Sequence, residues 1–134
     1  MKRTMFVAIC LFFTFSLYGE GEKTEMEKDN VVKLGNPAPP DAPKMEIEVS
    51  AKKYEFAPST IEVAVNTRLI IHLKSTDKEH GLELKAFKGK CVKAKPGTDA
   101  TIEFYVEKAG EYEFQCCKFC GMGHGKMKGK IVVK

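Results

Sequence analysis

Four side chains that can bind a metal lie within twelve residues near the C-terminus. Cys116, Cys120, His124 and Met127 follow the spacing Cys-x3-Cys-x3-His-x2-Met. Two thiolates, an imidazole and a thioether are soft to borderline donors, which suit copper better than magnesium, calcium or manganese. Three glycines between the second cysteine and the methionine leave the backbone free to turn these donors inward. The stretch therefore predicts a copper-binding loop.

Strand-like sequence lies on both sides of this loop. Residues 112–115 alternate in polarity before it, and Lys130 with the apolar residues 131–133 follows it. A rigid site also needs a ligand from a separate strand, and His80 is the candidate. It follows the polar loop 76–79 and begins a strand-like stretch. We therefore expect His80 at the same end of the fold as the ligand loop.

The whole region 44–134 has the pattern of an all-β domain. Apolar residues alternate with polar ones along several short stretches, and turn residues separate these stretches. No stretch after residue 44 has a helical period. Seven or eight short strands indicate a Greek-key β-sandwich or barrel. The expected strands are 44–50, 54–56, 61–65, 68–74, 80–84, 100–106, 112–116 and 130–133.

The N-terminal third has a different composition. Residues 1–19 begin with two basic side chains and continue with an apolar run, which is the layout of a secretory signal peptide. The run is short for a bilayer span. Residues 20–43 are acidic and then rich in proline, which predicts a flexible leader. We expect export to the periplasm, with membrane association only if the N-terminal segment stays uncleaved.

Export affects how the cysteines are interpreted. Without the signal peptide the chain keeps Cys91, Cys116, Cys117 and Cys120, which in an oxidising compartment could form two disulfides. Three cysteines within five positions are poorly spaced for such a framework, so metal ligation explains Cys116 and Cys120 better. Cys117 should point away from its neighbour in an extended segment. Cys91 and Cys117 are then buried thiols or a disulfide.

Charge gives a weaker indication of partners. The chain has a formal net charge of +4, and residues 116–134 contain five lysines without an acidic residue. These lysines either attract an acidic partner or only keep a sheet edge soluble. Aromatic residues do not alternate with them, so we do not expect nucleic acid as a partner.

The ligand spacing and three short motifs resemble those of cupredoxins. The spacing is similar to that of CuA domains, which occur in cytochrome oxidase subunit II and nitrous oxide reductase, and the resemblance covers roughly residues 44–134. The supporting motifs are Tyr112-x-Phe114-x-Cys116, Phe56-x-Pro58 with Ile61-x-Val63, and Asp77-x-x-His80-Gly81.

This resemblance implies a site with two copper ions, in which two thiolates bridge the metals. In that family the centre passes single electrons from a cytochrome c or a cupredoxin to the next redox centre. The resemblance therefore implies that this protein carries electrons and is not itself an enzyme. It could be an accessory of an oxidase or reductase. The implied metal ligands are His80, Cys116, the backbone carbonyl of Lys118, Cys120, His124 and Met127.

Three alternatives stay open from the sequence. A mononuclear cupredoxin would use two histidines, one cysteine and a weak methionine, which leaves one cysteine of the loop without a role. A periplasmic copper carrier or chaperone would bind the metal only for delivery. A thiol–disulfide module of the Sco type also pairs Cys-x3-Cys with a distant histidine, but that fold alternates strands and helices. The chain also contains no tryptophan, which members of the CuA family commonly place on the electron entry path.

Overall fold

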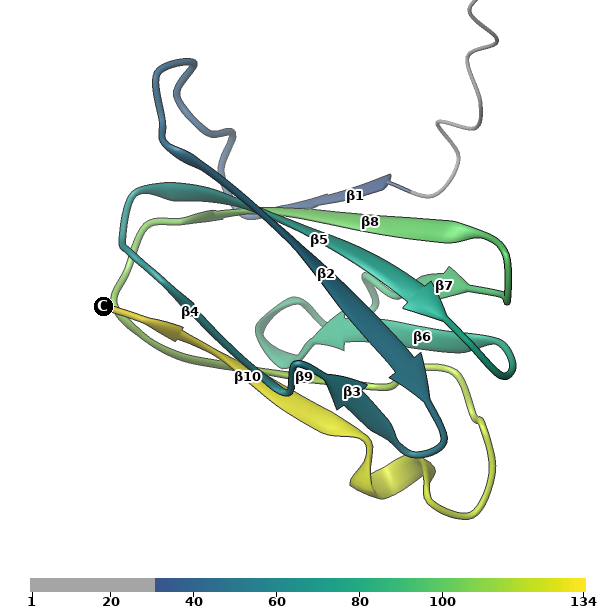
Figure 1. Ribbon diagram of the computed structural model, residues 1–134. Helices are drawn as coiled ribbons and strands as arrows, with labels where there is room; N and C mark the ends of the chain where they lie inside the picture. The colour runs from purple at the N-terminus through teal and green to yellow at the C-terminus, as the bar shows by residue number, and fades with distance from the viewer. Residues whose placement is uncertain (1–30) are drawn as a thin grey trace, which may run out of the picture.

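The computed structural model describes residues 31–134, so the expectations for the signal peptide, the anchor and the first part of the leader lie outside the described residues. Two five-stranded sheets pack face to face (Figure 1). The strands are β1 (Val31–Leu34), β2 (Lys44–Lys52), β3 (Glu55–Ala57), β4 (Thr60–Val63), β5 (Thr67–Ser75), β6 (His80–Leu84), β7 (Val92–Ala94), β8 (Asp99–Val106), β9 (Gly110–Gln115) and β10 (Lys128–Val133). Two single-turn 3-10 helices, η2 (Lys85–Phe87) and η3 (His124–Lys126), complete the elements.

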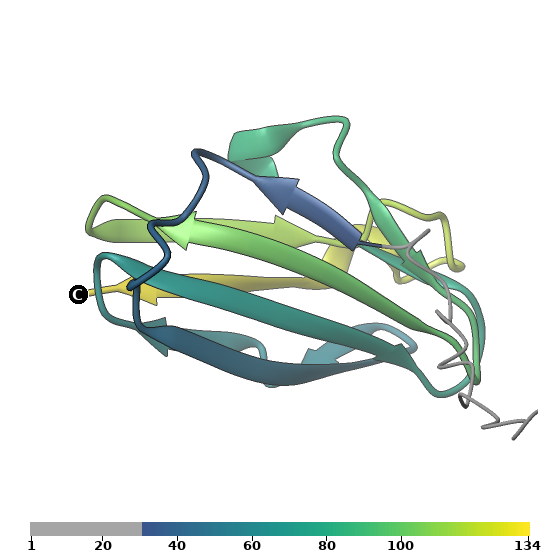
Figure 2. The same cartoon turned by 90° about the horizontal axis from the view of Figure 1, so that it is seen from above.

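The strand order is β1-β8-β5-β2-β3 in one sheet and β4-β10-β9-β6-β7 in the other. Seen from above, the first four strands of the first sheet lie side by side (Figure 2). The predicted all-β sandwich is confirmed. The described residues contain ten strands, where the sequence predicted seven or eight. The additional strands, β1 and β7, have four and three residues, which is too short for a polar–apolar alternation to be recognised.

Strand β1 lies in the segment that the sequence predicted as a flexible leader. It pairs in parallel with β8, so that Val31 faces Thr101 and Leu34 faces Phe104. Leu34 is buried in the core. The sheet therefore includes residues before 44, because β8 offers an open edge to which a short apolar segment can add.

The core fills the space between the two sheets. Strand β8 alternates between buried and partly exposed residues, as its sequence predicted, whereas the central strand β5 is buried along most of its length. Phe56 and Phe114 meet edge to face with ring centroids 5.3 Å apart. Burial of each large apolar side chain contributes about 1.5–3 kcal/mol. This core gives the loops at the sandwich ends a rigid support.

Four strand ends meet at one end of the sandwich. Strand β5 ends where the 76–79 loop leads to β6, and β9 ends opposite the start of β10, where Gln115 pairs with Lys128. The predicted ligand loop therefore lies at this end, which we call the ligand end (Figure 1). The opposite end, where β5 begins and β8 ends, is called the far end. No helix within residues 31–134 has the length and apolar character of a membrane span.

Candidate metal centre

The ligand end gathers three of the predicted ligands into one buried group. His80, Cys116 and Cys120 each place a ligand atom within 4.8 Å of the others. His80 is fully buried, and the two cysteines are only 4% and 2% exposed. His80 begins β6 and Cys116 follows β9, so two different strands contribute to the group. The expectation that His80 lies at the same end as the loop is met.

The remaining candidates surround Cys120 and Cys116 within the loop. The two Sγ atoms are 3.9 Å apart, so the thiols are close but not bonded to each other. Cys120 Sγ lies 3.6 Å from His124 Nδ1 and 3.9 Å from Met127 Sδ. Cys116 Sγ donates a hydrogen bond of 3.1 Å to the Lys118 carbonyl. All six predicted ligands thus belong to one connected cluster.

One ring nitrogen of His80 is left available for a metal. Its Nε2 lies 2.6 Å from Asp77 Oδ1. Its Nδ1 is buried without a hydrogen-bond partner, the single such side-chain nitrogen or oxygen among residues 31–134. Buried polar atoms nearly always have a partner, and an unpaired one costs free energy. A metal ion at Nδ1 would supply the missing partner, so the donor set fits copper.

Asp77 fixes the orientation of this histidine. Burial by itself raises the pKa of the Asp77 carboxyl, but hydrogen bonds from His80 and from the backbone amides of Lys53 and Lys78 outweigh that effect. Its pKa therefore lies below the ordinary value, and the group is a carboxylate at neutral pH. A carboxylate behind a metal-binding histidine sets the tautomer and strengthens the ligand.

The middle of the ligand loop rests on the ring of Tyr54. A Cβ atom added to Gly121 would lie 2.6 Å from the Tyr54 hydroxyl, and one added to Gly123 would lie 2.2 Å from the ring. Only a residue without a side chain allows the backbone to approach a ring this closely. The end of the loop is held by the bond from the Cys116 amide to the Met127 carbonyl, 3.0 Å long. The loop is therefore supported along its length.

The other two cysteines form a disulfide. Cys91 and Cys117 are bonded, with Cα atoms 6.0 Å apart. Of the alternatives left open by the sequence, the structure selects the disulfide, and Cys117 is directed away from the thiols of Cys116 and Cys120. Those two are the free cysteines of the described residues.

Burial also affects the protonation of the free thiols. It raises the pKa of Cys120 from 9.0 to about 11, and the neighbouring Cys116 adds to the shift. At neutral pH the Cys120 thiol of the metal-free protein is protonated. Because thiolates are the metal-binding form, a bound metal must displace this proton.

Two further side chains of metal-binding type, His72 and Met122, lie outside the cluster. His72 lies on β5, where its Nε2 is 3.2 Å from Glu46 and its Nδ1 is 3.4 Å from Thr101. Met122 is 98% exposed, so it is a loop residue without a packing role. Most lysines of the 116–134 stretch lie near glutamates, which weakens the positive field and favours the solubility interpretation. These pairs are Lys118–Glu79, Lys128–Glu113, Lys130–Glu111 and Lys134–Glu62.

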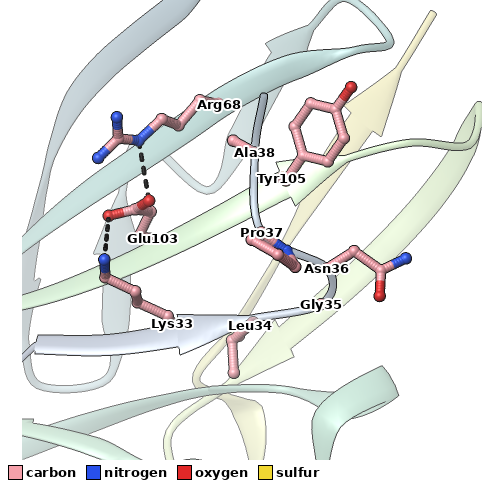
Figure 3. A pocket seen from close by; sticks show the side chains of 9 residues that line it. All are labelled: Lys33, Leu34, Gly35, Asn36, Pro37, Ala38, Arg68, Glu103 and Tyr105. Carbon is pink, nitrogen blue, oxygen red and sulfur yellow. Dashed lines mark hydrogen bonds and ion pairs between the residues drawn. The ribbon is translucent and has the colours of Figure 1, made fainter. Parts of the chain in front are cut away.

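The far end carries a cavity of different character (Figure 3). Arg68 Nε is 2.8 Å from a carboxylate oxygen of Glu103, and Lys33 Nζ is 3.9 Å from the other oxygen. Asn36 and Tyr105 also line the cavity, whose volume is about 350 Å³. Its lining contains no cysteine, histidine or methionine. The cavity therefore offers no site for a soft metal.

The chain is similar to known proteins of one domain family. Residues 6–133 match the cupredoxin-like domain family. Cytochrome c oxidase subunit 2 of Thermus thermophilus is 32% identical over 88 residues, which are 66% of this chain and 64% of that relative. The subunit 2 of Cyanidium caldarium is 29% identical over 85 residues, 63% of this chain and 33% of that protein. The chain thus spans less than two thirds of these relatives.

Solved structures show the same likeness. The cryo-EM structure of a heme-copper terminal oxidase dimer contains a chain with a TM-score of 0.63 and 31% identity, matched over 70% of this chain and 66% of that one. The periplasmic domain of oxidase subunit II from Bradyrhizobium japonicum has a TM-score of 0.61 and 22% identity, matched over 73% and 88%. The latter shows the fold alone.

Proposed function

Because this chain belongs to the cupredoxin-like domain family, we propose that it is an exported electron carrier with a dinuclear copper centre. The family and its relatives among the oxidase subunits imply copper-dependent electron transfer. Beyond this, we propose that two copper ions bind and we propose the identity of each ligand. The proposed ligands are His80, Cys116, the backbone carbonyl of Lys118, Cys120, His124 and Met127.

The observation that carries the dinuclear assignment is the pair of free, buried thiols. Cys116 and Cys120 lie 3.9 Å apart, with His80 near one side of the pair and His124 near Cys120. A mononuclear centre needs one thiolate and leaves the second buried without a role. Two thiolates and two imidazoles would be able to hold two copper ions.

The protein supplies a rigid and dry surrounding for this centre. When bound, the copper pair would accept and pass on one electron at a time. Asp77 holds the His80 ring, and the disulfide and the Tyr54 ring restrain the loop, so the ligands move little when the charge changes. Phe114 and Ile131, on the two strands that flank the ligand loop, are fully buried and would limit the access of water. Burial and hydrogen bonds around a metal set its potential.

We propose a redox protein, such as a cytochrome c or another cupredoxin, as the partner. Phe119 is 72% exposed and its ring lies 5.6 Å from that of His124, while Met122, three residues further along the loop, is almost fully exposed. These apolar side chains form a contact surface at the edge of the site. The chain would then serve an oxidase or reductase as an accessory, at the membrane only if its N-terminal segment is retained.

The copper-carrier alternative is weakened by the structure. Free thiols at Cys91 and Cys117 would have favoured it, but these two residues are bonded to each other. A carrier also needs a ligand loop that opens readily, whereas this loop is held at its start, middle and end. A site that binds Cu(I) selectively and shows no reversible redox cycling would favour the copper-carrier function over electron transfer.

The test is metal analysis with electron paramagnetic resonance on the copper-loaded full chain. We expect two copper ions per chain and a seven-line hyperfine pattern, because one unpaired electron is shared by two copper nuclei. One copper ion per chain with a four-line pattern and a single intense blue absorption band would contradict the dinuclear assignment and favour the mononuclear one.

A further inference from the structure

We propose that the Cys91–Cys117 disulfide is a positioning element of the metal centre, which fixes the ligand loop against β6 and thereby slows the loss of copper. This inference rests on the proposed copper site and adds to it two residues that touch no metal. Cys117 stands in the chain between Cys116 and Lys118, whose carbonyl accepts the Cys116 hydrogen bond. The bond therefore acts on a segment that contains two proposed ligands.

The partner half of the bond belongs to the strand pair that carries His80. Cys91 immediately precedes β7 (Val92–Ala94). Strand β7 pairs with β6 so that His80 faces Ala94 and Gly81 faces Lys93. The disulfide consequently ties the loop segment of Cys116 to the hairpin that positions His80. The two segments that carry these ligands, which lie far apart in the sequence, are thereby cross-linked.

The disulfide spans a place where the sheet itself provides no link. Strands β6 and β9 pair only through Glu83 with Gln115 and Leu84 with Phe114. The pairing thus ends at Gln115, before Cys116, and does not extend along β6 to His80. Beyond that point β6 pairs with β7 alone, so the ligand-bearing ends of β6 and β9 share no backbone ladder. The Cys91–Cys117 disulfide provides a covalent link between these two segments.

Close packing transmits the position of the disulfide to the histidine. A Cβ atom added to Gly81 would lie 2.6 Å from Cys117 Sγ and 3.0 Å from Cys91 Sγ. Gly81 is buried and follows His80 directly. Real Cβ atoms do not come within 3.0 Å of another atom, so the backbone beside His80 lies directly against the disulfide, closest to Cys117 Sγ. Any shift of the disulfide would therefore act on this backbone.

The bond also decides which thiols are left for the metal. Cys116, Cys117 and Cys120 lie within five positions, and a free thiol on Cys117 could pair with either neighbour in an oxidising compartment. With Cys117 bonded to Cys91, only Cys116 and Cys120 stay free among residues 31–134. The disulfide thus reserves these two thiols for copper.

The experiment compares copper loss from the full chain and from the double variant Cys91→Ala/Cys117→Ala. Both proteins are loaded with copper and mixed with a Cu(I) chelator under reducing conditions too mild to break the disulfide, and the rate of copper transfer is measured. Removal of groups that orient metal ligands weakens affinity by about 10–100-fold, so we expect the double variant to lose copper at least about tenfold faster. An unchanged rate would overturn the inference.

A control separates positioning from general stability. Val106→Ala removes two methyl groups from a fully buried residue at the far end, and it lowers the melting temperature without touching the ligand end. We expect its copper-loss rate to equal that of the parent protein. If it loses copper as fast as the double variant, the disulfide acts only through global stability and the inference fails.

Gly81→Ala provides a test that does not depend on folding without the disulfide. Its methyl group displaces the intact bond, so we expect faster copper loss and a changed hyperfine pattern. In the Cys91→Ala/Cys117→Ala background the same change should have a smaller effect, because both sulfurs are gone and the Lys118 amide nitrogen, 3.1 Å from the new Cβ, is the close contact that stays. An unchanged loss rate in Gly81→Ala contradicts the inference. If the parent protein binds only one copper ion, the dinuclear proposal fails but the inference about the disulfide does not. The comparison of copper-loss rates still tests the disulfide.

Discussion

The two ends of the sandwich are built from the same strands but carry opposite chemistry. The ligand end gathers soft donors that are buried and closely packed, with Cys116, Cys120 and Met127 all below 5% exposed. The far end gathers charged side chains around an open cavity, where Arg68 and Lys33 share the carboxylate of Glu103. Buried donors have few other partners, whereas exposed charges are satisfied by water. Changes at the ligand end should therefore have large effects, and changes at the far end small ones.

The largest effect is expected for Cys120→Ser. A hydroxyl is a much poorer copper ligand than a thiolate, so the variant should bind at most one copper ion and lose the seven-line pattern. Metal analysis and electron paramagnetic resonance check this outcome, with Cys91 and Cys117 left intact. Retention of two copper ions and of the seven-line pattern would show that Cys120 does not bridge the metals.

The next effect is expected for Asp77→Asn. An amide at this position cannot supply the negative charge behind His80, whose Nε2 lies 2.6 Å from Asp77 Oδ1. We expect copper affinity to fall about 10–100-fold, as measured by competition with a chelator. Glu79→Gln is a control in the same loop, because it removes a carboxylate whose ion pair of 3.6 Å is with the Lys118 ammonium group and not with His80. Equal losses in both variants would contradict the role of Asp77.

A smaller effect is expected for Gly123→Ala. The backbone of Gly123 has φ −90°, which alanine adopts freely, so the effect is purely steric. The new methyl group meets the Tyr54 ring at 2.2 Å, and overpacking of this kind costs about 1–3 kcal/mol of unfolding free energy. Denaturant unfolding of the metal-free protein measures the change.

Gly125→Ala is the matched control for this steric effect. Its Cβ would meet no atom within 4 Å, and the residue lies in the same loop two positions further on. We expect its unfolding free energy to stay within about 0.5 kcal/mol of the parent protein. If the two alanine variants are equally stable, the Tyr54 ring does not support the loop.

The pH dependence of the metal-free protein should reflect the buried thiol. The pKa of Cys120 is raised from 9.0 to about 11 in the folded state. Between these values the unfolded chain releases a proton that the folded protein keeps, so the free energy of unfolding falls as pH rises from about 9 to about 11. Below pH 9 the contribution is fully present. Unfolding curves of the parent protein and of Cys120→Ala, taken across this range, should differ in slope, and equal slopes would contradict the assignment.

The smallest effect is expected for Arg68→Ala at the far end. The Arg68 side chain is 38% exposed, and Lys33 stays near Glu103 after the change. Exposed ion pairs contribute about 0–1 kcal/mol, so we expect a change of that size in unfolding free energy and no change in copper content. A marked loss of copper from this variant would show that the two ends are coupled.

Much of the ligand end was predictable from local sequence. The spacing of Cys116, Cys120, His124 and Met127 depends on a short loop, and alternating polarity revealed the strands on both sides. The position of His80 followed from the polar loop before it. The family match confirms the predicted resemblance to cupredoxins. That copper binds these residues stays a prediction.

The remaining features depended on contacts between distant segments. Four cysteines allow several pairings, and only the packing of the β6–β7 hairpin against the ligand loop brings Cys91 to Cys117. The Tyr54 ring under the loop and the addition of β1 to β8 likewise leave no periodic signal in the sequence.

The sequence by itself determined the kinds of donor atom, their spacing in the loop and the β character of the scaffold, because these follow from residue type and local periodicity. Tertiary structure alone decided which cysteines are bonded, which nitrogen of His80 is left unpaired and how the loop is supported. Each of these depends on the distance between atoms far apart in the chain, which only the packed fold sets.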